Sequence, residues 1–176
     1  MTTSELRVNL ICEVAKQMPR KGHTNMMKAM YFLQEVYKLP LRYDFSIYTY
    51  GPYDEDVMAF LGYAEDEGLI NVKPVVDHGY RGYEITLQKG DTVLSEENMA
   101  AVEEIAEHFG DYTAKQWELA STIVFAYVSY TENNIEINTD EINEDVRRIK
   151  PHFSKEEIEQ ERKHLEDLNI LSRAIA

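Results

Sequence analysis

Residues 26–34 read MMKAMYFLQ, residues 48–53 read YTYGPY, and an acidic stretch then leads into Gly68-Leu69-Ile70. The first segment predicts a helix, because its apolar residues recur at helical spacing: Met26, Met30, Leu33 and Tyr37. The Gly-Pro pair at 51–52 predicts a turn, and Gly68 predicts the end of a helix. These three features determine the fold class, and none carries a catalytic group at a recognisable spacing.

On the N-terminal side, the pattern predicts a helix from Ser4 to Gln17 and a second helix capped by Thr24 or Asn25 and closed by Pro40. The alternation of residues 43–47 predicts a strand. A third helix is expected from Asp54 to Glu67, since its first turn holds Asp54, Glu55 and Asp56 and its inward positions are apolar.

Two strands are then predicted, Ile70 to Asp77 and Tyr83 to Gln88, around a loop at residues 78–82. Tyr83, Ile85 and Leu87 are expected on one face of the second strand. Three helices followed by a hairpin is the order of a winged helix. The sequence therefore predicts an α+β fold with a winged-helix lobe over residues 1–90.

The rest of the chain predicts a helical lobe over residues 91–176 that shares one core with the first lobe. Its helices are expected at 96–109, 114–131, 140–150 and 155–168. Two capping boxes, Thr113 with Gln116 and Ser154 with Glu157, fix the second and fourth starts. Residues 60–70 and 162–171 echo one another, so a degenerate second winged helix remains an alternative for this lobe.

Charge is distributed unevenly along the 176 residues, whose formal net charge is −14. Residues 1–42 carry +4, residues 43–110 carry −12 and residues 111–176 carry −6. Such a field disfavours nucleic acid and favours a basic protein partner. No apolar run reaches the length of a membrane helix and the first residues lack signal-peptide features, so we expect a cytoplasmic protein without membrane contact.

Cysteine and histidine give no sign of a metal or redox site. Cys12 is the one cysteine and is expected in the core. The histidines are scattered without metal-ligand spacing: His23, His78, His108, His152 and His164. No nucleophile motif or phosphate-binding glycine loop is present. We therefore expect a non-enzymatic protein that needs no cofactor.

Tyrosine is concentrated between residues 31 and 83, which hold nine of the twelve tyrosines. Tyr48 and Tyr50 lie on the opposite strand face from Phe45 and Ile47, beside a rigid Gly-Pro turn. Tyrosine commonly anchors protein interfaces. The predicted partner-binding residues are those of the turn and the carboxylates that follow it: Tyr48, Tyr50, Gly51, Pro52, Tyr53, Asp54 and Asp56.

The helix with Met30-Tyr31-Phe32, the Tyr50-Gly51-Pro52-Tyr53 turn and the Glu67-Gly68-Leu69-Ile70 stretch together resemble the YwgA-type family of uncharacterised bacterial and archaeal proteins. More distantly, the chain is similar to the Panacea antitoxin domain of the SocA and GepA relatives. The resemblance covers residues 6–90 and implies a non-enzymatic protein; in the Panacea branch such proteins bind a cognate toxin.

We therefore expect a protein-binding module, either antitoxin-like or a defence- or phage-associated adaptor, and a homodimer remains open. The alternative is a winged-helix transcriptional regulator that binds DNA through N-terminal basic residues: Arg20, Lys21, Lys28 and Lys38. Against this alternative, the third helix is acidic and contains no Lys or Arg, so it cannot neutralise phosphates in the major groove. Pairing of the cations with the acidic middle of the chain is the simpler expectation, and an enzyme is the least favoured class.

Overall fold

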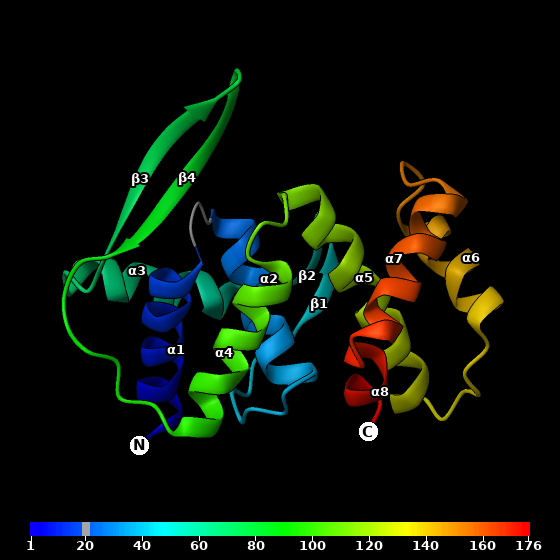
Figure 1. Cartoon of the computed structure of the whole chain (residues 1–176), viewed down its shortest axis with the longest axis horizontal. Coiled ribbons are helices and arrows are strands. Elements are labelled where there is room, and N and C mark those ends of the chain that lie inside the picture. Colours follow the sequence, from blue (N-terminus) through cyan, green and yellow to red (C-terminus); the bar gives the residue numbers. More distant parts are fainter. Residues whose placement is uncertain (19–21) are drawn as a thin grey trace.

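The computed structural model describes residues 1–18 and 22–176, and over these residues the chain has an α+β fold with eight helices and two antiparallel hairpins (Figure 1). The first half consists of α1 (Thr3–Gln17), α2 (His23–Glu35), β1 (Ser46–Tyr48), β2 (Gly51–Tyr53), α3 (Glu55–Asp66), β3 (Ile70–Asp77) and β4 (Tyr80–Leu87). The second half consists of α4 (Glu96–Phe109), α5 (Ala114–Glu132), α6 (Thr139–Ile149), α7 (Lys155–Asp167) and α8 (Ile170–Ala174).

Local capping signals place most helix starts correctly. Both predicted capping boxes are present, at the starts of α5 and α7, and α4 has the predicted bounds. The start of α2 was predicted wrongly, because its N-cap is Gly22 and no side chain caps it. Asn25 Nδ2 instead donates to the Tyr112 carbonyl at 3.3 Å, so this side chain links α2 to the α4–α5 connection.

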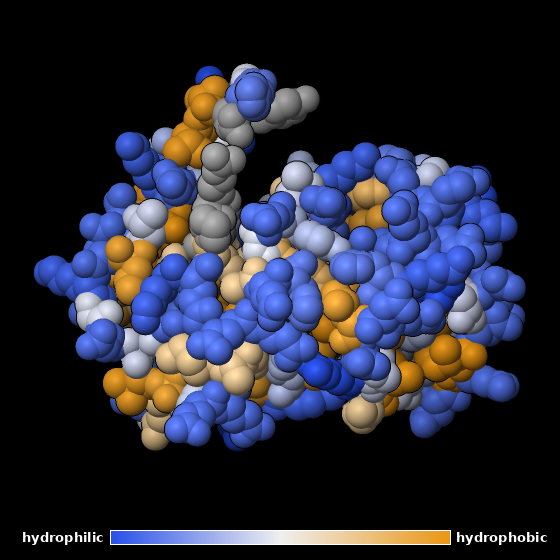
Figure 2. Space-filling model, viewed as in Figure 1, coloured by the Kyte–Doolittle hydropathy of each residue, from blue (hydrophilic) through white to orange (hydrophobic). Residues whose placement is uncertain are grey.

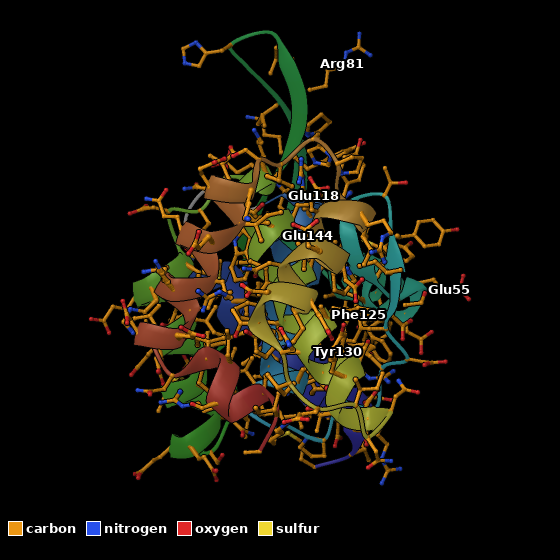
Figure 3. All side chains as sticks on the ribbon, turned by 90° about the vertical axis from the view of Figure 1, so that its right-hand side faces the viewer. Glu55, Arg81, Glu118, Phe125, Tyr130 and Glu144 are labelled. Carbon is orange, nitrogen blue, oxygen red and sulfur yellow. The ribbon has the colours of Figure 1, made fainter. Side chains whose placement is uncertain are left out.

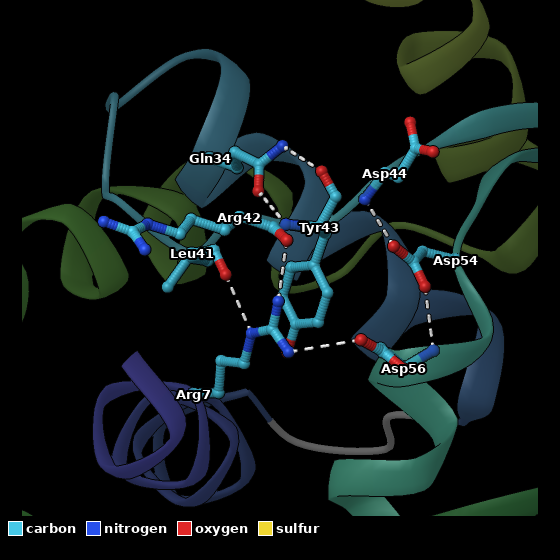
Figure 4. Close-up of polar contacts among 8 residues, drawn as sticks. All are labelled: Arg7, Gln34, Leu41, Arg42, Tyr43, Asp44, Asp54 and Asp56. Carbon is cyan, nitrogen blue, oxygen red and sulfur yellow. Dashed lines mark hydrogen bonds and ion pairs between the residues drawn. The ribbon is translucent and has the colours of Figure 1, made fainter. Parts of the chain in front are cut away.

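Residues 43–45 do not form the predicted strand, which is reduced to β1 (Figure 4). Gln34 takes both backbone groups of Tyr43, accepting from its N–H at 2.8 Å and donating to its carbonyl at 3.1 Å. Asp54 accepts the N–H of Asp44 at 2.5 Å. Side chains thus occupy the backbone groups that a neighbouring strand would have used.

Arg7 fastens this segment to α1 and α3 (Figure 4). Its guanidinium donates to the carbonyls of Leu41 and Arg42, each at 2.8 Å, and lies 3.3 Å from an Asp56 carboxylate oxygen. The same group stacks 4.1 Å above the Tyr43 ring. One buried cation therefore fixes the chain that leads from α2 into the β1–β2 hairpin.

The β3–β4 hairpin projects from the body as an arm (Figure 1). Its second strand begins at Tyr80, earlier than predicted, because His78 and Gly79 form a two-residue turn with φ values of 45° and 83°. Ile85 is buried, whereas Tyr83, predicted on the same strand face, is exposed and stacks on His23 with ring centroids 4.2 Å apart. Apolar side chains show along this arm on an otherwise mainly hydrophilic face (Figure 2).

One cluster of buried apolar residues includes side chains from both halves of the chain. At its centre Phe32 of α2 packs edge-to-face on Phe109 of α4 and Trp117 of α5, with centroids 5.3 Å and 5.2 Å away. Cys12 is buried as predicted, and burial raises the pKa of its thiol. Among the described helices, none has the length and apolarity required to cross a membrane.

The predicted order of three helices followed by a hairpin is present, with the short β1–β2 hairpin inserted between α2 and α3. The two segments that echo one another share one backbone feature, since Gly68 and Asn169 both have positive φ. The elements after these two residues differ, because Gly68 leads into strand β3 and Asn169 leads into helix α8.

Candidate protein-binding surface

The tyrosine hairpin, which we define as residues 46–53, has two solvent-exposed aromatic rings, those of Tyr48 and Tyr50. Ser46 pairs with Tyr53 and Tyr48 with Gly51, which leaves Thr49 and Tyr50 as a two-residue turn. Tyr48 and Tyr50 are each 65% exposed. Tyr48 lies on the strand face opposite Ile47, as predicted, whereas Tyr50 lies in the turn. The Tyr53 ring is partly buried and lies 5.5 Å from the Tyr48 ring. The exposed part of the hairpin is therefore aromatic.

Gly51 and Pro52 belong to the predicted site but are buried beneath the tyrosines. Gly51 has φ of +98°, and a Cβ there would lie 3.0 Å from Ser121 Oγ and 3.3 Å from Thr122 Oγ1 on α5. These two residues cannot touch a partner. Because Gly51 has no side chain, the hairpin can pack closely against α5, and Tyr48 and Tyr50 remain exposed to solvent.

We expect Gly51→Val to lower the free energy of unfolding by about 2 kcal/mol, because the side chain meets both a strained φ and the α5 hydroxyls. Thermal melts measure this loss. Gly68→Val is the matched control, since Gly68 also has positive φ but has open space around it. If the two variants melt alike, the crowding against α5 contributes nothing.

Two buried lysines donate hydrogen bonds to backbone carbonyls of the tyrosine hairpin. Lys28 of α2, 2% exposed, donates through Nζ to the Pro52 carbonyl at 2.5 Å. Lys150, which follows α6 and is 3% exposed, donates to the carbonyls of Tyr48, at 3.1 Å, and Thr49. The hairpin is thus bound to α2 in the first half of the chain and to the residue after α6 in the second half.

Glu118 of α5 is the carboxylate of this lysine cluster. Its Oε1 lies 3.0 Å from Lys150 Nζ and 3.3 Å from His152 Nε2. Burial lowers the pKa of Lys28 to about 7, with repulsion from Lys150 adding to the shift and attraction to Glu118 opposing it. Burial of the ammonium group is therefore the main cause of the lowered pKa of Lys28, and the neighbouring Lys150 adds to it.

Of the two carboxylates in the predicted site, one has a structural role and the other remains exposed. Asp54 is partly buried and caps α3, accepting from the Asp56 N–H at 2.8 Å in addition to the Asp44 N–H. Asp56 pairs with Arg7 but remains exposed. Glu55, which projects outward from the start of α3, and Asp44 are also exposed (Figure 3). Acidic groups therefore lie at the end of the hairpin remote from its turn.

Of the four cations predicted as a DNA-binding cluster, the two described ones, Lys28 and Lys38, make internal contacts. Lys28 is buried, and Lys38 donates to the Ala174 carbonyl at 2.7 Å. The simpler expectation was that these cations pair with the acidic middle of the chain. Lys28 and Lys38 instead each bind a backbone carbonyl. Arg20 and Lys21 lie outside the described residues.

The sequence reasoning missed Lys150, Glu118 and His152 altogether. A signal was present for two of the buried charges, since Lys28 lies between Met27 and Ala29, and Glu118 lies between Trp117 and Leu119. A helix that is apolar on all sides buries its charged residues too, and a buried charge requires a partner. Within residues 1–18 and 22–176, no group of three or more His, Cys, Asp or Glu is placed to hold a metal ion.

Comparison of the chain with protein-family models, with curated proteins and with solved structures yields no match.

Proposed function

We propose that this chain is a non-enzymatic protein-binding module that recognises a basic segment of a protein partner through the tyrosine hairpin. The observation that carries the proposal is the pair Tyr48 and Tyr50, 65% exposed on a hairpin that two buried lysines hold in place. Large exposed aromatic rings on a rigid support are typical of interface anchors, because little conformational entropy is lost when they bind.

The charge at the end of the tyrosine hairpin remote from its turn determines the class of partner that we propose. Asp44, Glu55 and Asp56 are exposed beside the hairpin, and the chain as a whole carries −14. Lysine and arginine side chains of a partner can pair with these carboxylates and stack on tyrosine rings. A basic protein segment fits this surface, whereas a phosphate backbone is repelled.

The resemblance to the YwgA-type and Panacea families supports the biological form of the proposal. In this reading the N-terminal lobe is a winged helix, and the module acts as an antitoxin or as a defence- or phage-associated adaptor. The partner is then a toxin or effector with a basic segment, and the tyrosine hairpin is the surface that holds it.

The test is affinity capture from the native host with wild type and with a Tyr48→Ala/Tyr50→Ala variant, each followed by a thermal melt. We expect the variant to melt within about 0.5 kcal/mol of wild type, because both rings are exposed. We expect it to lose the partner, since each anchor contributes about 2 kcal/mol, or roughly 30-fold in Kd.

Tyr63→Ala is the matched control, because Tyr63 is 52% exposed but lies on α3 outside the hairpin. It should retain the partner. A folded Tyr48→Ala/Tyr50→Ala variant that keeps every partner of wild type would refute the proposal. Micromolar retention of duplex DNA by wild type at near-physiological salt would instead favour a DNA-binding regulator.

A further inference from the structure

A hollow of about 490 Å³ lies where the chain passes from α6 into α7. Its lining is formed by the last turn of α6 and the start of α7, chiefly Arg147, Pro151, His152, Phe153 and Lys155. The hollow is open to solvent, so a ligand bound there is held chiefly by the charged side chains of its lining. The hollow shares no lining residue with the tyrosine hairpin.

The charge of the hollow is opposite to that of the chain. Residues 146–155 contain four Lys or Arg and one His and no Asp or Glu, in a chain with 32 acidic residues. Two permanent cations, Arg147 and Lys155, line the hollow, against one carboxylate, that of Glu156. An anion entering this hollow therefore meets an excess of positive charge.

The two permanent cations are available to a ligand. Arg147 pairs with Glu144 at 3.9 Å, and since both side chains are more than half exposed the pair is weak. Lys155 is exposed, and no ion pair between described residues includes it. Neither cation would have to break a strong internal contact in order to bind an anion.

One side of the hollow contains the rings of His152 and Phe153, which pack against each other. The His152 ring lies 4.4 Å from the Phe153 ring at an interplanar angle of 40°. Phe153 is buried. Its ring also contacts Lys115, whose Nζ lies 5.4 Å from the ring centroid. His152 is further held by Glu118 at 3.3 Å. A flat apolar group of a ligand can rest against the half-exposed His152 ring, because Phe153 and Glu118 already hold that ring in place before binding.

We propose that this hollow binds a small phosphate monoester. Arg147 and Lys155 supply two positive charges for the dianionic phosphate, and a guanidinium matches two phosphate oxygens at once. The organic part of the ligand lies against the His152 ring. This site is independent of the proposed protein-binding function.

The test is calorimetric titration of the full chain with phenyl phosphate at about 150 mM NaCl, where exposed charges are screened over about 8 Å. We expect saturable binding with a Kd of about 1 mM or lower, and no binding of phenol, which lacks the charge. Arg147→Ala and Lys155→Ala should each weaken binding about tenfold, as expected for one charge-assisted contact.

Arg148→Ala is the matched control, since Arg148 is also on α6 but pairs with Asp145 at 2.7 Å and does not line the hollow. It should bind phenyl phosphate like wild type. Two results would overturn the proposal: no saturable binding at about ten times the expected Kd, or an equal loss in Arg148→Ala, which would mark a diffuse charge effect.

Discussion

Replacing Lys150 by Ala should lower the free energy of unfolding by about 3–5 kcal/mol, the usual result of removing one partner of a buried ion pair. The substitution leaves the buried Glu118 carboxylate with His152 as its remaining neighbour in the ion-pair cluster. It also removes the donor to the carbonyls of Tyr48 and Thr49. Chemical denaturation measures the loss, and amide hydrogen exchange at residues 48–53 should become faster.

Lys163→Ala is the control for this variant, because Lys163 forms an exposed pair with Glu159 at 3.4 Å. Such a pair contributes less than about 1 kcal/mol. The double variant Lys150→Met/Glu118→Gln should recover part of the loss, since it leaves no buried unpaired charge. If Lys150→Ala is no more destabilising than Lys163→Ala, Lys150 does not hold the tyrosine hairpin.

The stability of the wild-type protein should rise by about 2 kcal/mol between pH 7 and pH 9 because of Lys28. Burial lowers its pKa to about 7 in the folded state, whereas an unfolded lysine keeps a pKa near 10.5. Across this window the unfolded chain binds more protons than the folded one, so raising the pH favours folding. Below pH 7 both states are protonated and the cost of burying the charge is fully present.

Lys28→Met removes this pH dependence, because methionine fills a similar volume without a titratable group. The measurement is chemical denaturation of both proteins between pH 7 and pH 9. Higher pH is avoided because burial raises the pKa of Tyr37, Tyr43 and Tyr112, which destabilises the fold once the unfolded tyrosines ionise near pH 10. An identical slope in Lys28→Met would mean that another group causes it.

Helix starts could be predicted from sequence where the determinants were local. The capping boxes at Thr113 and Ser154 need only residues three positions apart, and both are present. The strand predicted at residues 43–47 failed because its backbone groups are taken by Gln34 and Asp54. Gln34 and Asp54 lie 9 and 10 residues from the backbone groups that they bind, so the pattern of residues 43–47 alone could not reveal these contacts.

The features of the candidate site also fall into those that local sequence predicts and those that depend on residues distant in sequence. The exposure of Tyr48 followed from strand alternation, which is a local property, whereas Tyr50 is exposed because it lies in the hairpin turn. The burial of Gly51 and Pro52 depends on α5, and the support from Lys150 depends on a residue about 100 positions away in sequence. The sequence therefore predicts which rings are displayed, while only the fold reveals what holds them.

Photo-crosslinking from position 50 is the sharpest test of the tyrosine hairpin as a binding surface, with a benzophenone amino acid replacing Tyr50 in one variant and Tyr63 in another. Both positions are exposed, and only the first lies on the tyrosine hairpin. We predict a covalent adduct with the captured partner from position 50, mapped by mass spectrometry to a segment rich in Lys and Arg, and none from position 63. An adduct from position 63 alone, or one that maps to an acidic segment, would contradict the assignment of the tyrosine hairpin as the surface that recognises a basic partner.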